Sequence, residues 1–219
     1  NFTAISLEAS LKQLQEDFNH QIAERIQVIV YDSHNDFSQT NVVPLPVNAE
    51  GIGGVTDAFK NRITMPFSGN YTEFRSTLHH ELVHAVMNDM YYGGNVQSRL
   101  TGEALQIPLW LSEGLAEYTS LGWDTNTDMY IRDASINDYL PPIPRLGGYY
   151  AYRGGQSVWN YIVEEYGREK IGEIMQTMKN QRSVSIAFQR SLGLSVEELS
   201  NNWQEYNQKI YFPEVAERE

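Results

Sequence analysis

Residues 70–94, NYTEFRSTLHHELVHAVMNDMYYGG, decide the fold that this sequence predicts. Asn70 is a good N-cap, and Glu73 three residues later completes a capping box. Apolar residues then recur every three or four positions, which predicts one long amphipathic helix. They are Phe74, Leu78, Leu82, Ala85 and Val86. The helix is expected to stop before Gly93 and Gly94, because glycine favours helix ends.

This helix carries three of the five histidines, and residues 80–84 form an H-E-x-x-H motif. Residues four apart lie one turn from each other, with Cβ atoms about 5–6 Å apart, so His80 and His84 can bind one ion. Glu81 lies between them and can lean toward a ligand on the same side. The alternative is a pair of partly buried histidines with a solvated glutamate. His79 points about 100° away from His80 and is expected to be structural.

Two histidines leave a catalytic zinc site incomplete, because it normally takes three protein ligands and keeps a fourth position for water. The metzincin pattern would continue with glycine and histidine, but Met87 and Met90 stand at those positions. No histidine follows His84, so the missing ligand is a carboxylate or comes from upstream. Glu113 and Glu117 lie four apart in an otherwise apolar segment. A lone pair of this kind usually faces water, but beside an H-E-x-x-H helix it indicates a functional role.

The remaining segments predict an α+β fold, with a helix and strands first and only helices afterwards. The expected strands cover residues 25–32, 53–59 and 62–67, and the polar stretch 33–50 predicts a loop. The expected helices cover residues 6–26, 108–120, 155–166, 169–178, 184–191 and a last segment capped by Ser195. We therefore expect a small mixed or antiparallel sheet with the H-E-x-x-H helix, then a mostly helical C-terminal half. Residues 1–219 would form one domain, with lobes of about 1–92 and 105–219 and a zinc cleft between them.

Composition excludes several classes of protein. Sixteen Lys and Arg against 28 Asp and Glu give a net charge of −12, so the chain repels polyphosphates and no nucleic-acid partner is expected. The absence of cysteine excludes disulfide scaffolds, thiolate nucleophiles and cysteine-based metal sites. No apolar run approaches the roughly 18 residues of a membrane span, so none is expected.

The acidic stretch 124–128, DTNTD, imitates the start of a calcium-binding loop. Met129 and Ser135 stand where that loop needs a glycine and a bidentate glutamate. We therefore expect a solvated acidic loop here and no second metal site.

Three sequence blocks, in this order, resemble the gluzincin metallopeptidases. The nearest resemblance within that group is to the peptidase-MA-like domain, which is related to the aminopeptidase-N and thermolysin-like enzymes. The blocks are His80-Glu81-x-x-His84, Trp110-Leu111-x-Glu113-Gly114-x-Ala116, and Tyr152-Arg153-Gly154-Gly155 followed by a helix ending near Tyr166-Gly167. The resemblance covers about residues 25–211. It implies that Glu113 is the third zinc ligand and that Tyr152 stabilises the tetrahedral intermediate.

The mechanism implied by the resemblance uses one zinc ion, held by the two motif histidines and Glu113. The ion would lower the pKa of its bound water to about 7. Glu81 would accept the proton of that water during attack on a carbonyl and deliver it to the leaving amine. Zinc and the Tyr152 hydroxyl would stabilise the oxyanion. Glu117, one turn beyond Glu113, is expected to accept a hydrogen bond from the free ring nitrogen of His80.

The predicted edge strand at residues 53–59 is the expected place for an extended peptide to bind through main-chain hydrogen bonds. The residues assigned to this role are Gly54, Val55, Thr56 and Asp57. The G-x-M-E-N segment with which aminopeptidases hold a free amine has no counterpart here. We therefore expect an endopeptidase that acts on peptides or proteins. Chains of this kind resemble domains exported from bacteria, so a periplasmic or extracellular location is expected. The sequence implies no oligomeric state.

Two other functions fit the same residues. One is a catalytically idle, zinc-containing fold that binds a peptide, protein or glycan; such a fold would have no need of Glu81. The other is a non-enzymatic module that stacks sugars on aromatic rings. That module would use Tyr149, Tyr150, Tyr152 and Trp159.

Overall fold

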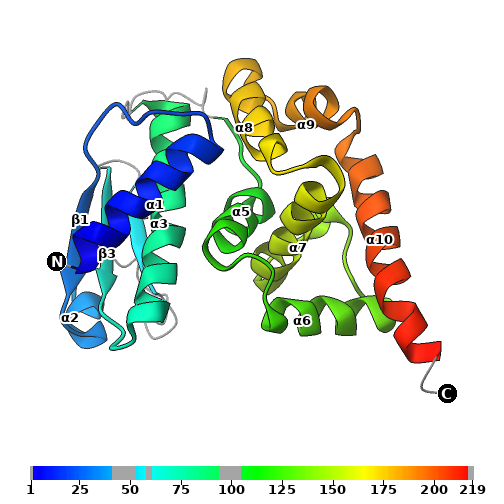
Figure 1. The fold of residues 1–219 in the computed structure, drawn as a ribbon, viewed down its shortest axis with the longest axis horizontal. Helices are drawn as coiled ribbons and strands as arrows, with labels where there is room; N and C mark the ends of the chain where they lie inside the picture. Colours follow the sequence, from blue (N-terminus) through cyan, green and yellow to red (C-terminus); the bar gives the residue numbers. More distant parts are fainter. Residues whose placement is uncertain (1, 41–52, 58–60, 94–104, 217–219) are drawn as a thin grey trace. The chain divides into compact units, whose positions relative to one another are not determined.

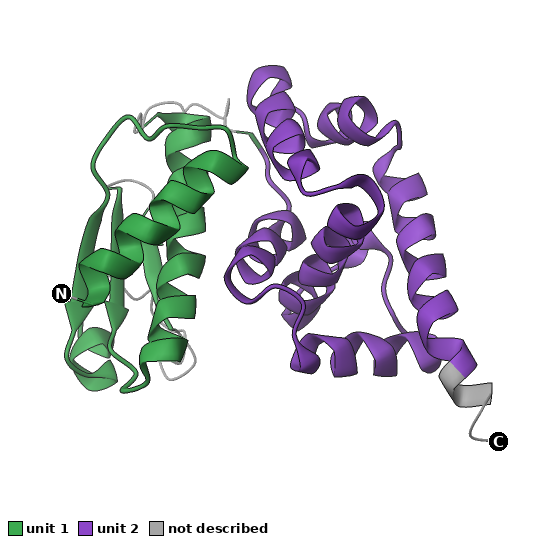
Figure 2. Cartoon of the chain, viewed as in Figure 1, with its two compact units in different colours: residues 1–105 green, residues 106–219 purple. Residues whose placement is uncertain are grey.

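The computed structural model describes residues 2–40, 53–57, 61–93 and 105–216. The chain divides into two compact units, residues 1–105 and residues 106–219 (Figure 2). Parts of the expected loop at 33–50 and of the expected strand at 53–59 lie outside the described residues. Within the described ranges, no helix has both the length and the apolar character that crossing a membrane requires.

Unit 1 contains a three-stranded mixed sheet (Figure 1). The central strand, β3 (Arg62–Pro66), pairs in parallel with β1 (Gln27–Tyr31) and antiparallel with β2 (Val55–Asp57). Because β3 has a neighbour on each side, its side chains are the most deeply buried of the sheet, Ile63 and Met65 among them. The small mixed sheet is as the sequence predicts.

The long helix of unit 1, α3 (Tyr71–Tyr92), packs against β2, β3 and α1 (Phe2–Asp17). The Asn70 side chain accepts hydrogen bonds from two main-chain amides of the first turn, at 2.9 and 3.4 Å. At the other end Gly93 adopts the left-handed conformation, with φ 54°, and its amide donates to the Asp89 carbonyl. Both ends of α3 therefore lie where the capping residues predict them.

The first helix is shorter than its apolar period predicts. α1 ends at Asp17, and Asn19 turns the chain with φ 48°. The segment that follows is held by a carboxylate of α3: His20 Nε2 lies 2.8 Å from Asp89 Oδ2, and the Ala23 amide donates to the same oxygen at 3.1 Å. Asp89 is buried, so these contacts satisfy a group that would otherwise be costly to bury.

A short helix, α2 (His34–Ser38), occupies part of the stretch predicted as a loop. The Ser33 hydroxyl caps it by accepting a hydrogen bond from the Asp36 amide at 3.1 Å. Phe37, on its inner face, is fully buried. One apolar residue and a Ser-x-x-Asp cap thus suffice for one turn of helix where the surrounding sequence is polar.

All the elements in the described part of unit 2 are helices, as predicted for the C-terminal half. Its elements are α5 (Leu109–Leu121), α6 (Thr125–Ile136), η2 (Ile143–Arg145), α7 (Tyr149–Tyr166), α8 (Glu169–Gln181), α9 (Val184–Leu192) and α10 (Val196–Ala216). The core contains Trp159 and Trp203, both fully buried. Of the helix pairs in the described residues, α5 and α7 have the most extensive contact with each other (Figure 1).

Two helices of unit 2 correct the sequence prediction. Residues 124–128 are not a solvated loop: Asp124 is the N-cap of α6, and its carboxylate accepts hydrogen bonds from the Asn126 and Thr127 amides. α7 begins at Tyr149, well before Gly155, where the sequence predicts its start. Glycine is a poor residue for a helix interior, so the glycine pair at 154–155 looks like a helix start in the sequence.

Candidate metal centre

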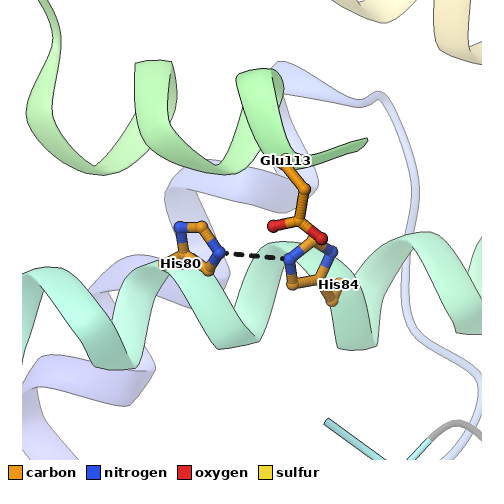
Figure 3. A group of neighbouring side chains, drawn as sticks. All are labelled: His80, His84 and Glu113. Carbon is orange, nitrogen blue, oxygen red and sulfur yellow. Dashed lines mark hydrogen bonds between the residues drawn. The ribbon is translucent and has the colours of Figure 1, made fainter. Parts of the chain in front are cut away.

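α3 presents two histidines on one face, as the four-residue spacing predicts. The Nε2 atoms of His80 and His84 lie 3.2 Å apart (Figure 3). Their ring centroids are 5.0 Å apart, and the ring planes meet at 71°. Both residues are partly buried. His79 has a different environment, because its Nδ1 lies 3.0 Å from the hydroxyl of Ser10 on α1.

Three residues form a group that could hold a metal ion: His80, His84 and Glu113 (Figure 3). Each offers one ligand atom, and these atoms all lie within 4.8 Å of one another. Two imidazole nitrogens and one carboxylate oxygen are a donor set of catalytic zinc, which keeps its fourth position for water. Magnesium and calcium prefer oxygen donors alone. The donor set therefore fits zinc, and it is the one such group in the described ranges of the chain.

Glu81 is buried although it carries an ionisable group, with an exposed fraction of 8%. Its carboxylate oxygen Oε2 lies 2.5 Å from the Thr56 hydroxyl. The same hydroxyl lies 3.0 Å from the main-chain oxygen of Glu81. A buried carboxylate needs hydrogen bonds in place of water, and β2 supplies one.

The residues predicted to bind a peptide lie on and beside β2, at the edge of the sheet. Two of them have partners within unit 1. The Thr56 hydroxyl lies beside Glu81, and the Asp57 carboxylate accepts a hydrogen bond from Arg62 of β3 at 3.4 Å. Val55 and Gly54 are partly buried. Binding of a peptide to this edge stays a prediction.

Tyr152 lies in the first turn of α7 and is half-buried. Its neighbours Tyr149 and Tyr150 pack on Tyr130 of α6, with ring centroids 5.0 and 4.9 Å from the Tyr130 ring. Burial, together with a hydrogen bond to Tyr130, raises the pKa of Tyr150 to about 12. Tyr149 accepts a hydrogen bond from Arg153 at 3.0 Å. Tyr149 and Tyr150 thus serve the packing of α6 on α7.

Glu117 forms an ion pair with Arg153, a residue for which the sequence predicts no role. Arg153 Nη1 donates to Glu117 Oε2 at 2.9 Å, to Gln156 Oε1 at 3.1 Å and to Thr127 Oγ1 at 3.2 Å. Burial acts to lower the pKa of Arg153, but the Tyr149 hydroxyl and the charge of Glu117 raise it above its usual value. The predicted hydrogen bond from His80 to Glu117 stays a prediction.

The helix that bears Glu113 meets α7 at a pair of glycines. A Cβ atom on Gly114 would lie 2.3 Å from the carbonyl carbon of Gly155, and one on Gly155 would lie 2.2 Å from the Trp110 carbonyl oxygen. Neither position has room for a side chain, so the two backbones are in direct contact. Trp159 Nε1 adds a hydrogen bond to the Leu111 carbonyl at 3.0 Å. These contacts fix the segment around Glu113 against α7.

The sequence matches the family model of the peptidase MA superfamily over residues 6–209. The chain belongs to the peptidase MA superfamily. Members of this superfamily are typically zinc-binding and have a zinc-peptidase-like fold. The group of His80, His84 and Glu113 agrees with that property. Neither a curated protein nor a solved structure matches this peptidase MA chain.

In this peptidase MA chain, one of the aromatic rings required by the sugar-stacking alternative is not accessible. Trp159 has an exposed fraction of 0%, so no sugar can reach its ring. Tyr149 and Tyr150 contact Tyr130, and Arg153 lies over the Tyr149 ring at 5.6 Å from its centroid. The set of rings proposed from the sequence therefore does not form one exposed stacking surface.

Proposed function

We propose that this chain is a zinc-dependent hydrolase of the gluzincin type that cleaves peptide bonds. The observation that carries the proposal is the grouping of His80, His84 and Glu113, with Glu81 between the histidines on α3. A zinc ion held by the three ligands would supply Lewis acidity and lower the pKa of the water it binds to about 7.

The chain's own residues would handle the proton and the developing charge. Glu81 takes a proton from the attacking water and delivers it to the amine that leaves when the carbon–nitrogen bond breaks. Its burial keeps bulk water from competing for that proton. The Tyr152 hydroxyl donates a hydrogen bond to the oxygen of the former carbonyl, on which negative charge develops.

The substrate would be an extended peptide segment that pairs with the edge strand β2. Such a strand can add a further strand through main-chain hydrogen bonds, which do not depend on side-chain identity. Because the aminopeptidase segment G-x-M-E-N is missing, cleavage within the chain is favoured over removal of terminal residues. An enzyme that cleaves within a peptide chain does not need residues that bind a terminal amine.

The variant Glu81→Gln tests the proposal. The amide has the shape of the carboxylate but cannot accept the proton, so kcat/KM should fall by a factor of about 10²–10⁴ while zinc content is unchanged. The measurement is digestion of a library of peptides with blocked termini, with and without a zinc chelator. Glu73→Gln, at the exposed start of the same helix, is the matched control and should keep full activity.

Two results would contradict the proposal. One is cleavage that persists in Glu81→Gln or in the presence of chelator. The other is a wild-type chain that binds zinc and cleaves no member of the library; it would instead support the catalytically idle fold that binds a peptide, protein or glycan.

A further inference from the structure

The Thr56 hydroxyl is placed to act on Glu81. Thr56 is the middle residue of β2, and its Oγ1 lies 2.5 Å from Glu81 Oε2 and 3.0 Å from the Glu81 main-chain oxygen. The two residues are 25 positions apart in the sequence, so this contact is produced by the packing of β2 on α3. Both residues lie in unit 1.

Gly54, the residue just before β2, also restricts the Glu81 side chain. A Cβ atom on Gly54 would lie 2.8 Å from Glu81 Cγ and 3.1 Å from its Oε1. Any side chain at this position would therefore displace the glutamate. The glycine permits the close approach, and the hydroxyl two residues later holds the end of the side chain. Together they limit the rotamers that Glu81 can adopt.

A hydroxyl suits a carboxylate that gains and loses a proton. When Glu81 is a carboxylate, the Thr56 hydroxyl can donate to Oε2. When the other oxygen, Oε1, takes the proton from water, Oε2 is still an acceptor and keeps its hydrogen bond from the Thr56 hydroxyl, with the Glu81 main-chain oxygen as a second acceptor. Both acceptors are within reach, so Thr56 stays satisfied through the proton transfer without movement of the backbone.

We propose that Thr56 is a positioning residue for Glu81. It holds one carboxylate oxygen and leaves the other for the proton transfer. This inference rests on the proposed function, because it assigns Thr56 a role in that reaction through Glu81. It adds to the role that the sequence predicts for Thr56, which is to help bind a peptide through the main chain of the edge strand.

The kinetic test compares Thr56→Val with Thr56→Ser. Valine keeps the shape and the strand preference of threonine but cannot hydrogen bond, and serine restores the hydroxyl. We expect Thr56→Val to lower kcat by a factor of about 10–100, since a misplaced catalytic group costs up to about that much. KM should change less than about twofold, because main-chain pairing with a peptide does not use the Thr56 side chain. Thr56→Ser should return kcat to within about threefold of the wild type.

A second measurement does not depend on activity. The melting temperature is determined for the wild type, Thr56→Val, Glu81→Leu and the double variant. Removing the hydroxyl leaves a buried carboxylate without its partner, so Thr56→Val should lower the melting temperature in the wild-type background. With Leu at position 81 there is no carboxylate to satisfy, and the same substitution should cost little or nothing.

These experiments separate failure of the inference from failure of the proposed function. Unchanged kcat in Thr56→Val, a loss of kcat that serine does not restore, or a rise in KM alone would overturn the positioning role. An equal loss of melting temperature in both backgrounds would do so as well. If the wild type shows no chelator-sensitive cleavage, the proposed function fails and the positioning role fails with it, while the melting temperatures still report whether Thr56 and Glu81 interact.

Discussion

At the residue scale, Arg153 joins three helices of unit 2. It lies on α7, and its donors reach Glu117 on α5 and Thr127 on α6. The Arg153 side chain is 18% exposed and that of Glu117 is 15% exposed, so solvent screens the pair only weakly. A planar guanidinium can serve several acceptors at fixed angles, which an ammonium group cannot do.

Replacement of Arg153 should therefore destabilise unit 2. We expect Arg153→Met to lower the free energy of unfolding by about 2 kcal/mol, because a partly buried carboxylate loses a charged partner. Arg153→Lys should recover only part of the loss. The measurement is urea unfolding followed by circular dichroism. The control is Lys209→Met, which breaks a pair with side chains 72% and 62% exposed and should cost less than about 0.5 kcal/mol. Equal losses in both variants would contradict the assigned importance of Arg153.

The sequence predicts residues that are close along one helix better than residues that meet across the fold. His80 and His84 follow from a spacing of four, because helix geometry fixes their separation. The spacing of residues does not identify the third ligand, and only the resemblance to gluzincins assigns that role to Glu113. Neither Thr56 beside Glu81 nor Arg153 beside Glu117 has any local signal, since these pairs are 25 and 36 positions apart.

At the element scale, the start of α6 depends on a charged cap. Burial acts to raise the pKa of Asp124, but hydrogen bonds from Gln156 and Thr127 and the charge of Arg153 outweigh it and lower the pKa below its usual value. A carboxyl group with a lowered folded-state pKa stabilises the fold above its unfolded-state pKa. That stabilisation is lost as the pH falls through the folded-state pKa.

The variant Asp124→Asn should show a weaker dependence of the melting temperature on pH in acid than the wild type. Asparagine is as good an N-cap as aspartate, so the helix start is kept while the titrating charge is removed. Between about pH 5 and pH 2, the melting temperature of the wild type should fall further than that of the variant. Glu205→Gln, at an exposed position of α10, should follow the wild type. Parallel curves for the wild type and Asp124→Asn would show that Asp124 adds nothing to the pH dependence.

The contact between α5 and α7 gives a second prediction at the element scale. Gly114→Ala would place Cβ 2.3 Å from the backbone of Gly155, so the helices must separate. We expect a loss of about 3 kcal/mol in the free energy of unfolding, as for other overpacked positions. Gly147→Ala is the matched control, because its Cβ would have no neighbour nearer than 3.9 Å. Full stability of Gly114→Ala would mean that the backbones do not meet as described.

The helices that the sequence predicts correctly are those with apolar faces and recognisable caps. α3 is an example, with Asn70 at its start and Gly93 at its end. α6 has a cap residue, Asp124, but no continuous apolar face, because its buried face includes the polar residues Thr127 and Ser135. The Thr127 hydroxyl donates to Gln156, 29 positions away, a contact that exists only in the folded chain, and the Ser135 hydroxyl donates to the Ile131 carbonyl one turn earlier in α6. A hydrophobic period therefore does not reveal this helix.

At the scale of the whole molecule, the order of elements and the composition were sufficient for the fold class. A sheet and the helix of the H-E-x-x-H motif come first, and all later elements of the described residues are helices. The expectation that nucleic acid is not a partner rests on the net charge of −12 and stays a prediction. Export from a bacterial cell and the organisation of residues 1–219 as one catalytic domain stay predictions.

The sharpest test of a zinc site at His80, His84 and Glu113 is the zinc-to-protein ratio, determined by mass spectrometry of the metal in purified, dialysed protein. The proposed metal centre predicts one zinc ion per chain for the wild type and for the variant His79→Ala, because the His79 ring contacts Ser10 and is not one of the three ligands. It predicts loss of zinc in His80→Ala and in Glu113→Ala, because each removes one of three protein ligands. A wild-type chain without zinc, or a Glu113→Ala variant that retains a full equivalent, would contradict the claim.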